Sequence, residues 1–256
     1  MWERAFLKQN AKLVLKTNYW TAFAVCLVAG ILAGSSGGSG GSTASNLSNP
    51  ANGQTGSIWD RIFSSIDLAI IISVVLIIAI LAIAYSVFVA NPITVGKTRY
   101  FVRSRIEVSR FSLLFSSFQN NAYMGAVKTM LLKDIYLFLW SLLLIIPGII
   151  KGYAYRMVPY ILADNPNIGA QRAIELSDQM TKGEKLNIFV LDLSFLGWIL
   201  LGALACGVGV LFVNPYIEAT NAELYAVLKD KAYRTGLCSP ADLGEGPMWG
   251  GPGYSM

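Results

Sequence analysis

Residues 68–90 read LAIIISVVLIIAILAIAYSVFVA, twenty-three positions without one charged side chain. A membrane-spanning helix needs ~20 mostly apolar residues, because the hydrocarbon core is ~30 Å thick and a helix rises ~1.5 Å per residue. This stretch therefore predicts a transmembrane helix. The composition agrees, since only 14% of the 256 residues are charged, too few to cover a soluble protein of this length.

Shorter apolar runs lie on both sides of this stretch, separated by Gly, Pro or charged residues. Together they predict an all-α fold, a polytopic membrane bundle of about six transmembrane helices. The shorter runs must recruit flanking residues, tilt or lie in thinned lipid, and the sequence does not decide whether the sixth crosses fully. The six predicted spans are Tyr19–Leu32, Leu68–Ala90, Leu131–Ile146, Ile149–Ala163, Phe189–Leu204 and Val208–Ala219.

The basic residues predict how the chain is oriented, because short loops rich in Lys and Arg stay in the cytoplasm. Basic clusters precede the first span, follow the second, separate the fourth from the fifth and follow the sixth. The segment 33–67 carries one basic residue, Arg61, and is assigned to the outside. Both termini are therefore predicted to be cytoplasmic. The clusters are Arg4, Lys8, Lys12 and Lys16; Lys97, Arg99, Arg103, Arg105 and Arg110; Arg172, Lys182 and Lys185; and Lys229, Lys231 and Arg234.

A secretory signal peptide is the competing interpretation of Met1–Gly34, which has a basic start, an apolar stretch and small residues. Two features favour a span instead. The lysines at 8, 12 and 16 share one helical face, and Trp20 stands where an interfacial anchor is expected.

Two segments are too rich in small residues to bury an apolar core. Residues 33–57 contain seven Gly and seven Ser, and are predicted to form a flexible extracytoplasmic loop. Residues 236–256 contain six Gly and three Pro, and are predicted to be a disordered cytoplasmic tail. The integral membrane helical domain is then residues 1–235.

A proline stands near the cytoplasmic exit of every second span, within Asn91-Pro92, Pro159-Tyr160 and Asn214-Pro215-Tyr216. A proline removes a backbone donor and kinks or ends a helix. The pattern predicts three helical hairpins in tandem, although spacings of 67 and 56 between the prolines leave chance as an alternative. The amphipathic segment Ile168–Met180 is expected to lie along the inner interface, against anionic lipid headgroups.

Four motifs resemble a known family: Asn91–Gly96, Ile146–Lys151, Pro159–Pro166 and Leu191–Trp198. Over about residues 1–230 the chain resembles bacterial membrane proteins grouped as domain of unknown function 975. That family is distantly similar to the membrane domain of some glycerophosphodiester phosphodiesterases, whose catalytic domain has no counterpart here. The resemblance implies a multi-pass protein of a bacterial plasma membrane and no activity. The Gly/Ser loop and the Gly/Pro tail depart from the family.

Ionisable residues inside predicted spans are the candidate functional residues, because each costs ~2.5–3.5 kcal/mol to insert. They are Asp134, Lys151, Arg156, Asp192 and Glu218. In one interpretation they lie near the headgroups or snorkel outward, and their role is structural. In the other, Arg156 pairs with Glu218 or Asp192 across the bundle and marks a substrate or ion path.

No catalytic, cofactor-binding or metal-binding residue is predicted. The chain has no histidine, which excludes a Ser-His-Asp triad, and its three cysteines form no paired motif. The basic residues at 97–110 follow from threading and do not indicate nucleic-acid binding.

Three function classes remain. We expect a non-enzymatic scaffold or accessory protein in envelope maintenance, transport or resistance, with the lipid bilayer and a membrane protein as partners. The alternative is a small transporter or channel whose path is lined by Arg156 and the intramembrane carboxylates. The third is a lipid-modifying enzyme that uses Asp192 or Glu218 as a base.

Overall fold

The computed structural model describes residues 2–32, 68–118, 122–204 and 208–244. These residues form helices and contain no strand, which confirms the all-α class for the part of the chain that is described. The predicted loop at 33–57 lies outside the described residues. The elements are α1 (Arg4–Leu32), α3 (Leu68–Tyr85), the π-helix η1 (Ser86–Ala90), α4 (Asn91–Ser104), the 3-10 helix η2 (Phe111–Phe118), α5 (Ala122–Leu143), α6 (Ile145–Ala154), α7 (Val158–Asp164), α8 (Ala170–Thr181), α9 (Lys185–Leu204), α10 (Val208–Arg234) and the 3-10 helix η3 (Pro240–Leu243).

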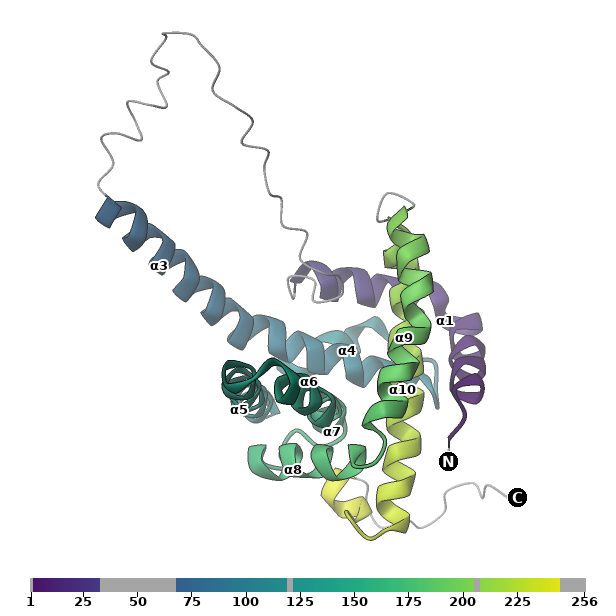
Figure 1. Cartoon of the computed structure of the whole chain (residues 1–256). Helices are drawn as coiled ribbons and strands as arrows, with labels where there is room; N and C mark the ends of the chain where they lie inside the picture. Colours follow the sequence, from purple (N-terminus) through teal and green to yellow (C-terminus); the bar gives the residue numbers. More distant parts are fainter. Residues whose placement is uncertain (1, 33–67, 119–121, 205–207, 245–256) are drawn as a thin grey trace.

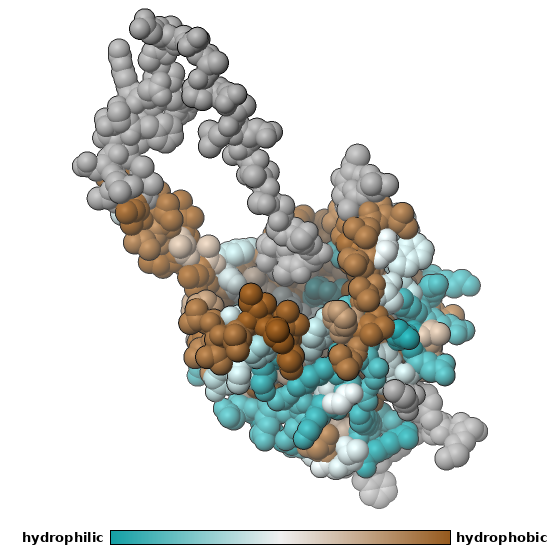
Figure 2. Space-filling model, viewed as in Figure 1, coloured by the Kyte–Doolittle hydropathy of each residue, from teal (hydrophilic) through white to brown (hydrophobic). Residues whose placement is uncertain are grey.

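The apolar and polar surfaces are segregated. In the view of Figures 1 and 2, hydrophobic residues cover α3, the α5–α6 hairpin and the upper part of α9, whereas hydrophilic residues gather around α8 and the lower part of α10. Exposed apolar side chains are dense at the α5–α6 turn, where Leu142 and Ile145 are 76% and 77% exposed. Such a surface is costly in water and stable in lipid.

The first predicted span is the second half of a bent helix. Asn18 has non-helical φ and ψ of −127° and 24°, and the two halves of α1 meet at 99°. The first half buries Leu7, Ala11 and Leu15 and leaves Lys12 and Lys16 exposed. The predicted basic face and the predicted apolar span therefore run in different directions.

Pro92 does not end the rod formed by α3, η1 and α4. The N–H of Asn91 donates to the carbonyl of Ser86, five residues back, which makes the π-turn. A proline also frees the carbonyl four residues earlier, here that of Phe88. The hydroxyl of Tyr123 in α5 donates to this carbonyl at 2.8 Å, so a neighbouring helix satisfies the break.

The predicted third and fourth spans differ most from the structure. The turn falls at Leu144, whose backbone is extended, and Ile149–Ala163 is divided between α6 and α7, helices of 10 and 7 residues. Residues 155–157 form a turn between them, and Pro159 stands in the first turn of α7. A continuous fourth span is therefore wrong, because the chain re-enters a helix at a proline, where no donor is needed.

Helices α9 and α10 approach closely through glycine. A Cβ added to Gly209 would lie 2.6 Å from Cα of Gly202, so a contact between small residues lets these helices pack closely. Pro215 lies inside α10 and does not end it. The hydroxyl of Tyr19 donates to the carbonyl of Phe212 at 3.1 Å, near this proline.

Helix α8 is amphipathic as predicted, but protein covers its apolar face. Ala173, Ile174 and Leu176 are at most 6% exposed, and the helix packs on α5, α6, α7 and α10. Its N-cap is Gly169, with φ of 88°, and Asn167 instead closes a local turn on the side chain of Asn165. Protein rather than lipid covers the apolar face, because the sequence pattern does not distinguish the two as apolar neighbours. The position of α8 along the inner interface stays a prediction.

The first nine residues of the predicted tail, 236–244, are folded in the structure. Ser239 and Asp242 form a capping box on η3, and Leu243 is 1% exposed. Residues 245–256 lie outside the described part of the chain.

By length and apolarity, two of the described helical segments can cross a membrane, Ile72–Ser104 and Lys185–Gly202. The bent pair Arg4–Lys16 and Asn18–Leu32 is a third if it is one span. Six spans stay a prediction.

Candidate functional site

The candidate site is a polar ladder on α10, formed by Glu218, Asn221 and Tyr225. Spacings of three and four residues place all three on one face of the helix. Their partners are Lys97 from α4, Arg156 from the turn between α6 and α7, and Asp164 from the end of α7. The ladder thus joins helices that are far apart in sequence.

Among the partners of the ladder, Arg156 makes the most side-chain contacts. Its Nη1 donates to Oδ2 of Asp192, and its Nη2 donates to Oδ1 of Asp192 at 2.8 Å and to Oδ1 of Asn221 at 3.1 Å. The ring of Tyr153 lies 5.8 Å from the guanidinium. The two-point contact with the carboxylate is the geometry in which arginine binds most strongly. The side chains of Arg156 and Asp192 are 22% and 30% exposed, so water screens them only in part.

The other predicted carboxylates have different partners. Oε1 of Glu218 accepts from Nζ of Lys97 at 2.6 Å, so Glu218 is not the partner of Arg156. Oδ2 of Asp134 accepts from Nδ2 of Asn91 at 3.1 Å, and its Oδ1 lies 3.1 Å from Nζ of Lys133. Of the five predicted residues, the structure thus brings Arg156 and Asp192 into direct contact.

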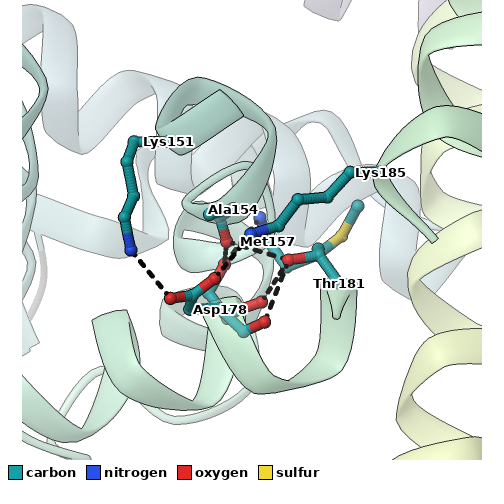
Figure 3. A network of polar contacts seen from close by, with 7 residues as sticks. Lys151, Ala154, Met157, Asp178, Thr181 and Lys185 are labelled. Carbon is teal, nitrogen blue, oxygen red and sulfur yellow. Dashed lines mark hydrogen bonds and ion pairs between the residues drawn. The ribbon is translucent and has the colours of Figure 1, made fainter. Parts of the chain in front are cut away.

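Lys151 belongs to a second network, centred on Asp178 in α8 (Figure 3). Nζ of Lys151 in α6 and Nζ of Lys185 in α9 donate to the two carboxylate oxygens of Asp178, at 3.0 and 2.9 Å. The aromatic rings of Trp140 and Tyr155 also lie within 5.6 Å of the Lys151 ammonium. Lys151 therefore contacts a polar helix rather than the outer headgroups that snorkelling predicts.

The same network stabilises the turn that separates α6 from α7. The hydroxyl of Ser177 donates to the carbonyl of Ala154 at 2.7 Å and accepts from the N–H of Met157 at 3.1 Å. Thr181 donates to the same carbonyl at 3.3 Å (Figure 3). Side chains of α8 thus satisfy backbone groups at this turn, which sets the position of Arg156.

The Asp178 network carries a pH dependence. Burial opposes ionisation of Asp178, but hydrogen bonds from Lys185 and Lys151 outweigh it and lower the pKa of this carboxyl. A carboxyl whose pKa is lowered on folding stabilises the protein above its unfolded pKa, and this stabilisation is lost as the pH falls through the folded pKa.

We therefore expect Asp178→Asn to reduce stability at neutral pH by about 0.5–1 kcal/mol, a modest value because the side chain is partly exposed. The difference from the wild type should begin to shrink as the pH falls below the ordinary carboxyl pKa of about 4 and should disappear below the lowered pKa of the folded protein. Thermal unfolding in detergent micelles across this range measures it. Asp230→Asn is the matched control, because the Asp230–Arg234 pair is mostly exposed, and its loss should have little effect at any pH.

Several residues of the site are not evident from composition alone. Lys97, Asp164 and Asp178 lie outside the apolar runs. An ionisable side chain there is ordinary and does not by itself indicate a functional residue. The signal that identifies the ladder is the spacing of Glu218, Asn221 and Tyr225 along one helix. Among the described residues, no group of three or more Cys, Asp or Glu side chains is arranged to hold a metal ion.

Residues 106–232 match the family described as "Protein of unknown function (DUF975)". The match covers about half of the chain, including Arg156, Asp192 and the polar ladder, and leaves the motif at Asn91–Gly96 outside it. No curated protein and no solved structure matches the chain.

Proposed function

We propose that this chain, similar over about half of its length to the DUF975 family, is a multi-pass protein of a bacterial plasma membrane that acts as a non-enzymatic scaffold or accessory protein. Its role would lie in envelope maintenance, transport or resistance, with a membrane protein as partner. The further similarity to the membrane domain of glycerophosphodiester phosphodiesterases belongs to this proposal and stays a prediction.

The observation that carries the proposal is the internal pairing of Arg156. Its guanidinium is occupied by Asp192 and Asn221, and Lys97 and Glu218 neutralise each other in the same ladder. A transport path needs charged groups that exchange partners with a solute or ion. Charged side chains that pair with one another between helices contribute to packing. This pairing supports the scaffold function in preference to a transporter or channel.

The distribution of surfaces supports a membrane orientation with both termini in the cytoplasm. In Figure 1 the start of α1 and the end of α10 lie away from the tip of α3, beside the hydrophilic region of Figure 2. The basic residues of these helices favour the cytoplasmic side. The about six spans in three hairpins are part of this proposal, with α6 and α7 together as the broken fourth.

Cysteine labelling tests the orientation. In a chain with Cys26, Cys206 and Cys238 replaced by alanine, Ser45→Cys should react with a membrane-impermeant maleimide in intact cells. Ser255→Cys should react only after permeabilisation. Labelling of both positions in intact cells, or release of the protein by alkaline carbonate, would contradict the proposed topology.

Paired substitution tests the scaffold against the transporter. A deletion strain should regain resistance to a membrane-active agent when it expresses Arg156→Leu/Asp192→Leu, which removes both charges and leaves neither unpaired. Arg156→Leu alone is the control and should accumulate poorly, because it leaves Asp192 uncompensated. A double variant that is as abundant as the wild type yet inactive, together with solute flux through wild-type proteoliposomes, would instead establish the transporter.

A further inference from the structure

A cleft of about 610 Å³ lies where the first half of α1 meets α9 and α10. Lys8, Lys12 and Lys16 line it from α1, and Trp198, Phe212 and Tyr216 face them from the other two helices. Its volume falls within the ~300–1,000 Å³ of small-ligand sites. One wall is therefore basic and the other aromatic.

The three lysines differ from most cations of the core-facing helices. Lys97, Arg105 and Arg156 each contact a carboxylate within 3 Å. In the part of the chain that the structure describes, no carboxylate forms an ion pair with any of the three lysines of the cleft. Three like charges at successive helical turns repel one another by a few tenths of a kcal/mol per pair. An arrangement of this kind is complementary to an anion.

Aromatic rings hold two of these three ammonium groups in place. Nζ of Lys8 lies 4.5 Å from the centre of the Phe195 ring, and Nζ of Lys12 lies 5.9 Å from that of Tyr216. Phe195 and Tyr216 pack edge to face, at 5.6 Å between ring centres. Each cation–π contact attracts the ammonium group to the ring and reduces the freedom of a long side chain. The positive charge is thus partly preorganised before an anion arrives.

The apolar part of the cleft indicates what the anion is attached to. Trp198 is 57% exposed and Phe212 is 45% exposed, and the upper part of α9 is apolar (Figure 2). A small inorganic anion would leave this apolar surface exposed, whereas an acyl chain would bury it. Because α1 bends at Asn18, the lysines lie beside the point where its apolar half begins. In the proposed membrane orientation, this is the depth at which phosphate headgroups meet acyl chains.

We propose that this cleft is a binding site for an anionic phospholipid, with the phosphate on Lys8, Lys12 and Lys16 and an acyl chain along Trp198 and Phe212. The inference rests on the proposed membrane location. It goes beyond it in assigning one lipid to one cleft rather than a general attraction of basic loops to the cytoplasmic leaflet.

Native mass spectrometry of the full chain in micelles tests the proposal. We expect phosphatidylglycerol to be retained in preference to phosphatidylcholine. The triple variant Lys8→Gln/Lys12→Gln/Lys16→Gln should lower the affinity for phosphatidylglycerol about 30-fold or more, since each basic residue contributes about 1 kcal/mol near an anionic lipid. Lys8→Arg/Lys12→Arg/Lys16→Arg should retain it.

The matched control is Arg110→Gln/Lys128→Gln/Lys182→Gln. It removes the same charge from residues that do not line the cleft, and it should change the affinity less than threefold. An equal loss in both triple variants would show a general charge effect and overturn the site. Unchanged affinity in the cleft variant would also overturn the site. The proposed membrane location is tested separately, and it would still hold if the protein stays in carbonate-washed membranes.

A brominated chain locates the lipid and separates it from free phosphate. Phosphatidylglycerol brominated on its acyl chain should quench tryptophan fluorescence, and Trp198→Phe should remove most of the saturable part of that quenching. Inorganic phosphate at the same concentration should neither bind nor displace the lipid. Displacement by inorganic phosphate, or quenching that Trp198→Phe leaves unchanged, would contradict the proposal.

Discussion

We expect Arg156→Ala to lower the free energy of unfolding by about 2–3 kcal/mol. Removing one partner of a buried ion pair costs about 3–5 kcal/mol, because the other charge stays in the protein without compensation. The value is reduced here because the side chains of Arg156 and Asp192 are 22% and 30% exposed. Asp192→Ala should have a similar effect, since it leaves the guanidinium with the single side-chain acceptor Asn221 among the described residues.

A double-mutant cycle separates this pair from its surroundings. The variant Arg156→Ala/Asp192→Ala should lose less than the sum of the two single variants, with a coupling of at least about 1 kcal/mol. Unfolding by dodecyl sulfate in mixed micelles, followed by tryptophan fluorescence, measures each corner. Arg156→Lys should keep the charge and lose the two-point contact, so an intermediate stability is expected. Additive single effects would show that the pair is not coupled.

We expect Gly96→Ala to be the most destabilising of the small substitutions, by about 3 kcal/mol or more. Gly96 lies in α4 against the backbone of η2, and an added Cβ would stand 1.9 Å from the carbonyl oxygen of Leu114 and 2.7 Å from its carbon. A backbone atom cannot rotate out of the way as the end of a side chain can. Because Leu114 is fully buried, the whole segment would have to move, and overpacking of that kind costs 1–3 kcal/mol or more.

Gly197→Ala is the matched control for Gly96→Ala. Both glycines lie in long helices, but a Cβ at Gly197 meets nothing within 4 Å. Alanine is the better helix former by up to about 1 kcal/mol, so Gly197→Ala should be neutral or stabilising. The same unfolding assay compares the two variants, and equal stabilities would mean that α4 and η2 do not pack as closely as described.

The helical character of the described chain could be predicted from sequence because a long apolar run can satisfy all its backbone groups within itself only as a helix. The rod of α3 and the apolar α9 follow from this argument, and both meet the length and apolarity of a span. The short runs are different. Ile149–Ala163 has the composition of a span but forms α6 and α7, and the turn between them depends on Ser177, which arrives from another helix.

The sequence also could not decide which carboxylate pairs with Arg156, because that choice depends on residues from other helices. Arg156 required a carboxylate, and Asp192 and Glu218 were equal candidates by depth. The structure places Asp192 at Arg156 because Lys97 already occupies Glu218, and Lys97 was interpreted only as a loop charge. The basic face of Lys8, Lys12 and Lys16 was readable, whereas the aromatic wall opposite it comes from residues almost two hundred positions away.

The sequence alone therefore determined that helices apolar enough to span a membrane are present, the type of secondary structure of the described chain and the residues whose charge needs a partner, because these follow from local composition and spacing. Only the tertiary structure decided which charges neutralise which, where α6 ends, which neighbour covers α8 and where a basic face meets an aromatic one. Those outcomes depend on contacts between helices, and the energies of such contacts are set by distances that no local pattern encodes.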